Sequence, residues 1–409
     1  MKSNIVKFSQ LAEIVAGQSP ESKNYSSHEG FPFLQGNRTF GSLYPIIDTY
    51  TKKITKIARS GEILMSVRAP VGALNFANTD LCIGRGLAAV RAKNGNNEFL
   101  YYNLKYNVQR LIQISSGTTY DSVTKDQLSN FELIVPTGNQ KNISNFLMDI
   151  DQKIELNNKI NSELESMAKL IYDYWFVQFD YPDENGNPYK SSGGKMVYNE
   201  ELQREIPEGW QSGELKDLAI LYRGVTYNKF DILDSTKPNS IPILRATNIT
   251  KNSIDNDNMV FVSSHLVDKN QRLSKYDILI TMSSGSKEHI GKNGFYYFEN
   301  KVGFGAFCSR IVSKTPISRF YLGIFMQSNF TKELIRKQCL GTNINNLNNS
   351  IVNSFPLPIP PNSVLSDFHN SVSSIFERIG NNYKENVELV KLRDWLLPVL
   401  MNGQVTIKD

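Results

Sequence analysis

Two long segments of the chain carry apolar residues at the alternating spacing of three and four that predicts an amphipathic helix. The first runs from Gln140 to about Gln178 without proline or glycine. The second runs from Ser363 to Leu397, and Pro398 is expected to end it. Because the heptad spacing persists over many turns, the two helices are expected to form a coiled coil. The expected seam positions are Ile143, Phe146, Ile150, Lys153, Asn157, Ile160, Leu164, Met167, Ile171 and Tyr174 in the first helix, and Leu365, Phe368, Val372, Ile375, Ile379, Asn382, Asn386, Leu389, Arg393 and Leu396 in the second.

Polar residues of the two seams predict how the helices pair. An antiparallel pair that sets Asn157 opposite Asn382 also brings Lys153 opposite Asn386, so the polar layers meet at the middle. Buried polar groups that satisfy one another fix the register of a coiled coil. We therefore expect an antiparallel coiled coil with its register set by Asn157, Asn382 and Asn386, and with the domains before the helices at opposite ends of a rod.

The sequence that precedes each helix occurs twice, about 220 residues apart. Pro32–Leu34 returns as Pro242–Leu244, and Ser60–Met65 returns as Lys275–Ile280. Further matched pairs are Gln10–Ala12 with Asp217–Ala219, Gly17 with Gly224, Gly117 with Gly341, and Phe131–Pro136 with Phe355–Pro360. A period this long exceeds that of solenoid repeats, so each copy is expected to be a whole domain.

The expected fold class is therefore α+β, with two similar mixed α/β domains, two long helices and an internal pseudo-twofold repeat. Within the domains, Phe99–Ile114 and Phe320–Gln338 are expected to be helical, with Gly117 and Gly341 as candidate C-caps. The expected segments are a first domain at 1–137, a first helix at 138–180, a connecting segment at 181–210, a second domain at 211–361, and a second helix with its tail at 362–409.

The net charge of +5 is unevenly divided along the chain. Residues 1–137 carry 15 Lys and Arg against 10 Asp and Glu, and residues 211–361 carry 18 against 11. Residues 138–210 carry 7 against 13, and residues 362–409 carry 5 against 6. Two basic domains joined by an acidic spacer indicate two separate contacts with a polyanion, although differences of this size also arise by chance in ordinary domains.

The remaining composition excludes several classes of protein. Cys82, Cys308 and Cys339 have no spacing typical of a disulfide framework or a zinc ribbon, and the four histidines lack metal-ligand spacing. Residues 1–5 form no apolar leader, and no run of about 18 apolar residues occurs. We expect a cytoplasmic protein with no membrane segment and no bound metal.

At this point the chain resembles a known family, the specificity subunits of type I restriction-modification systems, over essentially its whole length. The most specific stretch begins at the end of the first helix. Its motifs are Ile154–Asn161, Tyr174–Asp180, Asn187–Val197 and Glu205–Trp210, with the looser Leu392–Asp394 and Leu396–Met401 in the second helix.

The resemblance implies that each basic domain is a target-recognition domain for one half of a bipartite, asymmetric site on double-stranded DNA. The helices would set the gap between the half-sites and dock two methyltransferase subunits, through which restriction subunits would join. Adenine methylation and cleavage, with S-adenosylmethionine, ATP and Mg, would belong to those partners. This chain would then have no catalytic residue and bind no cofactor.

Direct readout of DNA requires Arg, Asn, Gln, Ser and Thr on loops that reach the bases. Corresponding loops of the two copies supply such residues, and Arg68 and Lys287 follow the strand-like runs Ile63–Val67 and Ile278–Met282. The candidate DNA-binding residues of the first domain are Gln18, Ser19, Gln35, Asn37, Arg38, Ser66, Arg68, Arg85, Ser116, Thr118 and Thr119. Those of the second are Arg223, Thr226, Arg245, Thr247, Asn248, Ser283, Ser284, Ser286, Lys287, Arg310, Thr342, Asn343 and Asn345.

Three other interpretations remain open. An enzyme is disfavoured, because Asn187–Tyr189 lacks the second proline of an amino-methyltransferase motif and the residues around Gly194 do not complete a P-loop. The chain would otherwise be a non-catalytic coiled-coil scaffold that binds proteins, or a DNA-binding inhibitor of a restriction complex. Trp175 and Trp395, near corresponding helix ends, suit either packing or partner docking.

Overall fold

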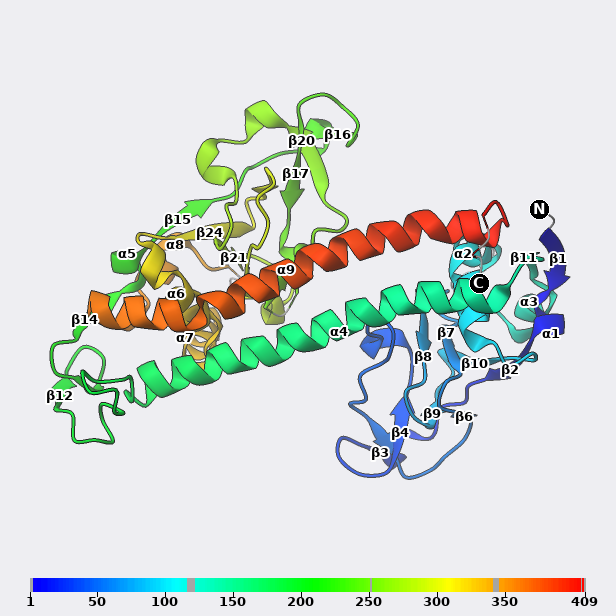
Figure 1. Cartoon of the computed structure of the whole chain (residues 1–409), viewed down its shortest axis with the longest axis horizontal. Helices are drawn as coiled ribbons and strands as arrows, with labels where there is room; N and C mark the ends of the chain where they lie inside the picture. The colour runs from blue at the N-terminus through cyan, green and yellow to red at the C-terminus, as the bar shows by residue number, and fades with distance from the viewer. Residues whose placement is uncertain (1–2, 116–121, 251, 341–345, 406, 408–409) are drawn as a thin grey trace. The chain divides into compact units, whose positions relative to one another are not determined.

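The computed structural model describes residues 3–115, 122–250, 252–340, 346–405 and 407 (Figure 1). The chain divides into two compact units, Met1–Lys159 with Glu385–Asp409, and Ile160–Lys384. Each compact unit thus combines one copy of the repeat with paired segments of the two long helices.

In the first unit, mixed strands and short helices precede the long helix. The central sheet has the order β2-β10-β7-β8, a second sheet has the order β3-β5-β4-β9-β6, and β1 pairs with β11. The elements are β1 (Ser3–Lys7), α1 (Phe8–Leu11), β2 (Ala12–Ala16), β3 (Tyr25–Ser26), β4 (Phe31–Leu34), β5 (Tyr50–Thr51), β6 (Ile57–Ala58), β7 (Ile63–Ser66), β8 (Leu74–Phe76), β9 (Leu81–Ile83), β10 (Leu87–Ala92), α2 (Asn97–Ser115), α3 (Lys125–Asn130), β11 (Glu132–Pro136) and the first part of α4 (Gln140–Tyr172).

The second unit repeats the order of the central sheet, whereas its second sheet has four strands in place of five and β18 pairs separately with β19. Its central sheet has the order β15-β24-β21-β22, a second sheet has the order β16-β20-β17-β23, and β14 pairs with β25. The elements after α4 are β12 (Met196–Asn199), β13 (Arg204–Pro207), β14 (Gln211–Glu214), α5 (Leu215–Leu218), β15 (Ala219–Arg223), β16 (Ile232–Leu233), β17 (Ser240–Leu244), β18 (Ile249–Thr250), β19 (Ser253–Ile254), β20 (Val260–Ser263), β21 (Ile278–Thr281), β22 (Asn293–Phe295), β23 (Gly303–Phe304), β24 (Cys308–Ser313), α6 (Arg319–Gln327), α7 (Asn329–Leu340), α8 (Asn349–Asn353), β25 (Pro356–Ile359) and α9 (Asn362–Met401).

Matching details confirm that the sequence repeat is a structural repeat. The only parallel pairs among the named strands of the described chain are β4 with β9 and β17 with β23, which occupy equivalent places in the two copies. The two expected strands are present as β7 and β21, and all of their residues are buried because each strand lies inside its sheet. Helix α2 also forms over the expected residues.

The expected helix Phe320–Gln338 is instead two helices, α6 and α7, separated at Ser328. Ser328 has an extended backbone, with φ −64° and ψ 156°. Its hydroxyl oxygen accepts a hydrogen bond from the backbone N–H of Thr331 at 3.2 Å. Because serine caps a new helix start in this way, the apolar spacing continues across a break that periodicity alone does not reveal.

Helix α9 passes through Pro398 and ends at Met401, so the expectation that Pro398 ends the helix was wrong. The proline lies in the last turn, where its missing N–H removes a single helical bond. Leu397, Leu400 and Met401 are buried in the core of the first unit and favour the added turn. The helix then stops at Gly403, which has φ +68° and donates to Leu400 O at 3.1 Å.

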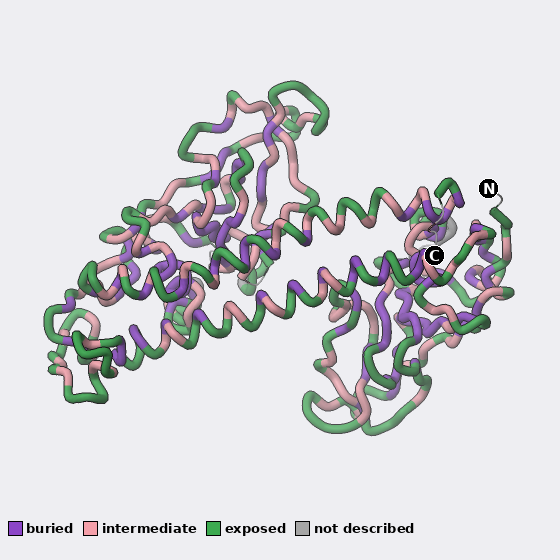
Figure 2. The backbone as a smooth tube through the Cα atoms, viewed as in Figure 1, coloured by how far each residue is buried: buried purple, intermediate pink, exposed green. Residues whose placement is uncertain are grey.

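The buried stripe of α4 differs from the expected seam at alternate positions (Figure 2). Ile143, Ile150 and Asn157 are buried as expected. The positions Phe146, Met167 and Tyr174 are exposed, and in each case the next residue is buried. Those buried neighbours are Leu147, Ala168 and Trp175. The stripe therefore follows a spacing of four and three from Ile143, because α4 packs against its domain as well as against α9.

The helices pair antiparallel, but one turn away from the expected register. In the first unit Asn157 Nδ2 donates to Asn386 Oδ1 at 2.9 Å, and in the second Asn382 Nδ2 donates to Asn161 Oδ1 at 2.7 Å. Asn157 is thus not opposite Asn382. Asn161 was absent from the expected seam, and the observed register gives it a partner.

Glu165 on α4 supplies a prediction about pH. Burial is the main influence on this carboxyl group and raises its pKa above the ordinary value of 4.5. A raised folded-state pKa means that the folded chain binds this proton more readily, so its stability falls as the pH rises from about 4.5 through the folded-state pKa. Glu165→Gln should therefore raise the melting temperature at pH 7 more than at pH 4, by about 2–4 °C per kcal/mol regained. Thermal melts across this range will test it, and an equal change at every pH would contradict it.

Candidate nucleic-acid interface

Backbone hydrogen bonds join four loops of the first domain into one cluster. Gln18 N donates to Ile83 O at 2.9 Å, which ties the loop after β2 to the end of β9. Gly86 N donates to Gln35 O at 3.3 Å, and Val67 N donates to Gly86 O at 3.0 Å. We call residues 17–19, 35–38, 67–70 and 84–86 the first loop cluster. It brings together candidate residues that are up to about 70 positions apart in the sequence.

Most candidate side chains of the first loop cluster are available to a ligand. Gln18, Gln35, Arg68 and Arg85 are exposed, and Ser19 and Asn37 are partly exposed. Arg38 is also exposed and lies 2.6 Å from Asp48, where this guanidinium holds the pKa of the Asp48 carboxyl below its usual range.

Ser66 differs from the other described candidates of the first domain in its burial. Its side chain is buried, and its hydroxyl donates to the backbone carbonyl of Arg68 at 2.8 Å. A hydroxyl held in this way shapes the loop that presents Arg68, and it is not free to reach a base.

Glycine is required where the loops approach most closely. A Cβ atom on Gly17 would lie 2.2 Å from the carbonyl oxygen of Gly84. In the second domain a Cβ atom on Gly224 would lie 2.2 Å from the carbonyl oxygen of Gly305. Gly17 and Gly224 therefore have equivalent roles, because any side chain at either position would push two loops of its own domain apart.

The second domain builds its cluster by equivalent contacts. Val225 N donates to Phe304 O at 2.8 Å, and Gly305 N donates to Leu244 O at 2.9 Å. Met282 N and Ser283 N both donate to the carbonyl oxygen of Phe307, at 2.8 and 3.3 Å. We call residues 224–226, 245–247, 283–286 and 305–307 the second loop cluster. Its candidates Thr226, Thr247 and Ser286 are exposed, and Arg245, Ser283 and Ser284 are partly exposed. Arg223, also exposed, directly precedes the cluster.

Two candidates of the second domain are structural. Asn248 is 4% exposed and donates to the carbonyl oxygens of Asp255 and Asp257, at 3.0 and 2.7 Å. The side chain of Arg310 is 11% exposed, and its Nε lies 2.6 Å from Asp277 Oδ2. Glu62 has the place of Asp277 in the first copy and pairs with Arg91 in the same manner. These polar groups form hydrogen bonds and an ion pair within their own domain.

Several candidates lie on residues that the structure does not describe. They are Ser116, Thr118, Thr119, Thr342, Asn343 and Asn345, and the side chain of Lys287 is likewise outside the description. After residues 116–121, Val123 N donates to Val67 O at 3.0 Å, which joins this part of the chain to the first loop cluster. After residues 341–345, Leu347 N donates to the carbonyl oxygen of Met282 at 2.7 Å, directly before the second loop cluster.

Phe307 is a residue of the second loop cluster that sequence reasoning missed. Its ring is 67% exposed, although its backbone carbonyl is fixed by two hydrogen bonds. The signal was present in the repeat, because Gly305–Phe307 occupies the place of Gly84–Gly86. An exposed aromatic ring therefore stands where the first domain has glycine next to Arg85.

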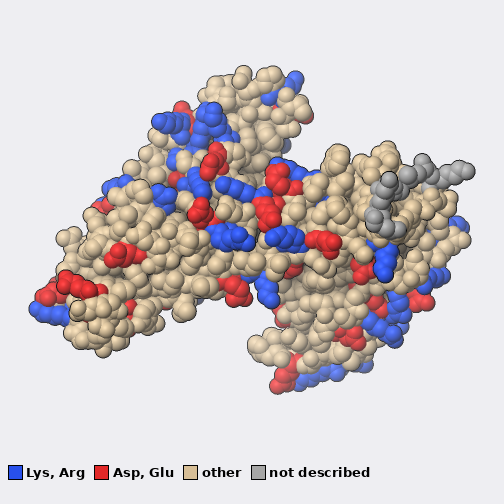
Figure 3. Space-filling model, in the orientation of Figure 1, with Lys and Arg blue, Asp and Glu red and all other residues tan. Residues whose placement is uncertain are grey.

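Charged side chains of both signs lie on the surface of the molecule (Figure 3). Figure 3 shows Lys and Arg side chains interleaved with Asp and Glu on the face in view, rather than gathered in one basic patch.

No group of three or more His, Cys, Asp and Glu side chains suited to a metal occurs among the described residues. No helix in the described part of the chain has the length and apolar character needed to cross a membrane.

The two tryptophans differ from each other. Trp175 is 8% exposed and packs on Phe368 with ring centroids 5.7 Å apart, which confirms its packing interpretation. Trp395 is 66% exposed on α9 in the other unit, so packing does not account for it.

Two matched α/β domains in one chain, each with a cluster of loops that carry polar side chains, define a protein with a duplicated domain. The family model described as the type I restriction modification DNA specificity domain matches residues 2–166 and 207–378, and the chain belongs to this family.

Relatives extend the match over the whole chain. The type I restriction enzyme MjaIX specificity subunit of Methanocaldococcus jannaschii is 26% identical over 99% of this chain and 94% of its own length. The type I restriction enzyme EcoKI specificity subunit of Escherichia coli (strain K12) is 29% identical over 50% of this chain and 45% of its own. The crystal structure of a type I restriction-modification S subunit from M. genitalium covers 100% of this chain and 97% of its own, with a TM-score of 0.57 at 16% identity, and shows the same fold.

Proposed function

We propose that the chain is the DNA sequence-recognition subunit of a type I restriction-modification complex, and that each domain reads one half of a bipartite, asymmetric site. The observation that carries the proposal is the pair of loop clusters, which have the same backbone scaffold and different side chains. Two domains with the same backbone arrangement and different exposed side chains recognise different half-sites. Methylation of adenine and DNA cleavage are then the work of methyltransferase and restriction subunits that bind to this chain.

The exposed side chains suit direct readout. Amide groups such as those of Gln18 and Gln35 form bidentate hydrogen bonds with adenine, and the guanidinium groups of Arg68 and Arg85 match guanine. The second loop cluster offers Thr226, Thr247, Ser283 and Ser286 in place of most of these groups. Hydroxyl groups serve several bases, so the two half-sites should differ in composition.

The test is methylome sequencing of a host that expresses this chain with its cognate methyltransferase subunit, compared with the same host without this chain. A new split motif with methylated adenine in both halves is expected. Failure of any motif to appear while the complex is intact would overturn the proposal and favour a scaffold. Binding to a cognate duplex should also weaken steeply and linearly in log K against log salt, whereas a protein interface would be far less sensitive.

Phe307→Ala should relax recognition in one half-site only. A ring that stacks on a base or contacts a thymine methyl contributes about 1–3 kcal/mol, which is roughly a 5- to 150-fold change in affinity. The methylome of this variant should lose selectivity at a position of the half-site read by the second domain and retain the other half-site. Phe230→Ala is the matched control, because that ring is 96% exposed and lies outside the second loop cluster. Equal effects of the two substitutions would contradict the assignment.

The observed register of the two long helices indicates where residues can be inserted without breaking the asparagine pairs. Four residues inserted between Asn157 and Asn161, with four between Asn382 and Asn386, leave both asparagine pairs intact. They lengthen each helix by about 6 Å, which is between one and two base pairs at roughly 3.4 Å per pair. If the helices set the gap, the methylated motif should gain one or two unspecified bases while both half-sites stay unchanged. A change in the half-sites themselves would show that the helices do not act as a ruler.

A further inference from the structure

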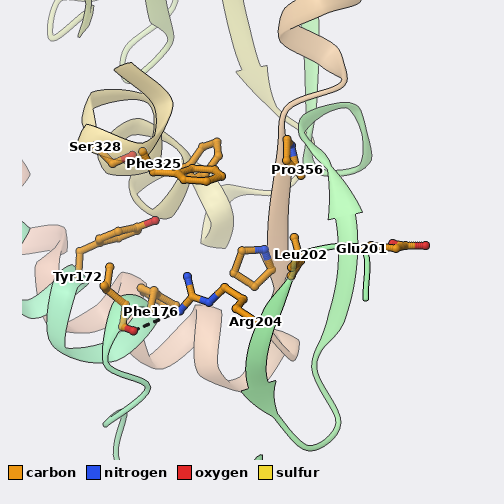
Figure 4. Close-up of a pocket in the computed structure, with 11 residues that line it drawn as sticks. Tyr172, Phe176, Glu201, Leu202, Arg204, Phe325, Ser328 and Pro356 are labelled. Atoms are coloured by element: carbon orange, nitrogen blue, oxygen red, sulfur yellow. Dashed lines mark hydrogen bonds between the residues drawn. The ribbon is translucent and has the colours of Figure 1, made fainter. Parts of the chain in front are cut away.

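A small pocket lies beside the end of α4 in the second unit (Figure 4). Its volume is about 110 Å³, well below the roughly 300–1,000 Å³ of small-molecule sites. Most of its walls are apolar, and Arg204 on β13 provides the charged group that faces the space. The pocket is therefore suited to one or two side chains of another protein.

Arg204 is half-buried without a carboxylate. Its guanidinium Nη2 donates to Val177 O at 3.2 Å and its Cζ lies 4.5 Å from the centre of the Phe179 ring. Among the residues that the structure describes, no Asp or Glu forms an ion pair with Arg204. Burial is the main influence on its pKa and lowers it. A planar donor group with unused N–H bonds in a partly dry site is suited to bind a carboxylate.

The neighbouring acidic groups do not fill this role. Glu201 lines the pocket, but Figure 4 shows its carboxylate directed away from Arg204. Asp173, on the turn that follows α4, is paired with Lys169. The positive charge of Arg204 is thus available to a group from outside the chain.

Exposed apolar residues continue from the last turns of α4 into the π-helical turn Asp173–Val177 that borders the pocket. Met167 and Leu170 on α4 are 53 and 68% exposed, and Tyr174 and Val177 on the π-helical turn are 38 and 50% exposed. Val177 belongs to both this apolar stripe and the pocket wall, and Phe330, which also lines the pocket, is 53% exposed. A run of exposed apolar residues of this kind, with a charged group at one end, is typical of a surface that packs against a helix.

We propose that the Arg204 pocket receives an acidic side chain from a helix of a partner subunit, and that apolar residues of the same helix cover the stripe at residues 167–177. The carboxylate accepts hydrogen bonds from the Arg204 guanidinium, and the pocket walls exclude water from this contact. The inference rests on the proposed function, under which the methyltransferase subunit is that partner. Charge complementarity fixes the direction in which the helix lies, since its acidic residue must reach the Val177 end of the stripe.

Affinity of the full chain for its cognate methyltransferase subunit tests the inference. Arg204→Gln should raise the Kd roughly tenfold or more, because a charge-assisted bond is lost, and Arg204→Lys should lose less. Lys195→Gln is the matched control from the same connecting segment, since its side chain is 70% exposed and pairs with Glu208. An acidic residue of the partner should exist whose change to Arg restores binding to Arg204→Glu.

A second pair of variants tests the apolar stripe while Arg204 is unchanged, so the result does not depend on whether the Arg204 variants fold. Leu170→Lys alters the most exposed residue of the stripe and should also raise the Kd at least tenfold, whereas Ile220→Lys, on an exposed position of β15, should not. Unchanged affinity in both Arg204→Gln and Leu170→Lys would overturn the inference and leave the proposed function in place. If the wild-type chain does not bind the methyltransferase subunit, the proposed function fails first, and this inference fails with it.

Discussion

Replacing Arg393 with alanine should cost about 3–5 kcal/mol of stability, because it leaves the buried carboxylate of Asp151 without its countercharge. Arg393 Nη1 lies 2.6 Å from Asp151 Oδ1, and the side chains are 14% and 6% exposed. Tyr102 donates its hydroxyl to the other carboxylate oxygen at 2.7 Å. Lys105 lies 4.0 Å away, and burial lowers the pKa of this amine, so it is a poor substitute for the guanidinium.

Urea unfolding of the full chain measures this loss as a lower midpoint for the transition of the first unit. Lys391→Ala is the control, because Lys391 pairs with Glu388 on the same helix while 67% exposed, and such surface pairs are worth less than about 1 kcal/mol. Asp151→Asn together with Arg393→Met should recover part of the loss, since neither charge then remains buried. Similar midpoints for Arg393→Ala and Lys391→Ala would show that the buried pair contributes nothing.

Gly17→Ala should abolish recognition of one half-site. The added methyl group would lie 2.2 Å from Gly84 O, so the loops after β2 and before β10 must separate. Overpacking of this kind costs about 1–3 kcal/mol, and it displaces Gln18 and Arg85 from a common surface. Gly224→Ala should have the same effect in the second domain through Gly305 and should abolish the other half-site.

The controls for this pair come from other loops of the same two clusters. A Cβ atom on Gly36 or on Gly285 meets no atom within 4 Å, and neither glycine has a positive φ. Gly36→Ala and Gly285→Ala should therefore leave the methylated motif unchanged. Methylome sequencing of the four variants gives the result directly, and loss of both half-sites from either Gly17→Ala or Gly224→Ala alone would contradict independent reading by the two domains.

The repeat predicted most of the fold, because short apolar runs at matching places specify matching strands. Ile63 and Ile278 begin equivalent central strands, and Gly17 and Gly224 make equivalent close contacts. The register of the helices was wrong by one turn for a physical reason. Heptad counting considers one partner for each helix, whereas α4 also packs against its domains, and this selects Asn161 for burial.

The candidate site was harder to predict than the fold. Polar residue type does not distinguish a side chain that faces solvent from one that holds a loop, and Ser66, Asn248 and Arg310 proved to be of the second kind. Phe307 was not among the candidates because a phenylalanine ring offers no hydrogen bond to a base edge. The exposed candidates, including Arg85 and Thr226, remain predictions until DNA binding is measured.

The first domain completes its core with the end of the chain. Leu397, Leu400 and Met401 pack with residues of β7, β10 and α2, although about 280 to 340 residues separate them along the chain. A ribosome-bound or prematurely terminated chain therefore lacks part of the core of its N-terminal domain, even though that domain was translated first. A product that stops before α9 would expose the apolar residues that Leu397, Leu400 and Met401 cover, and it would be open to proteolysis.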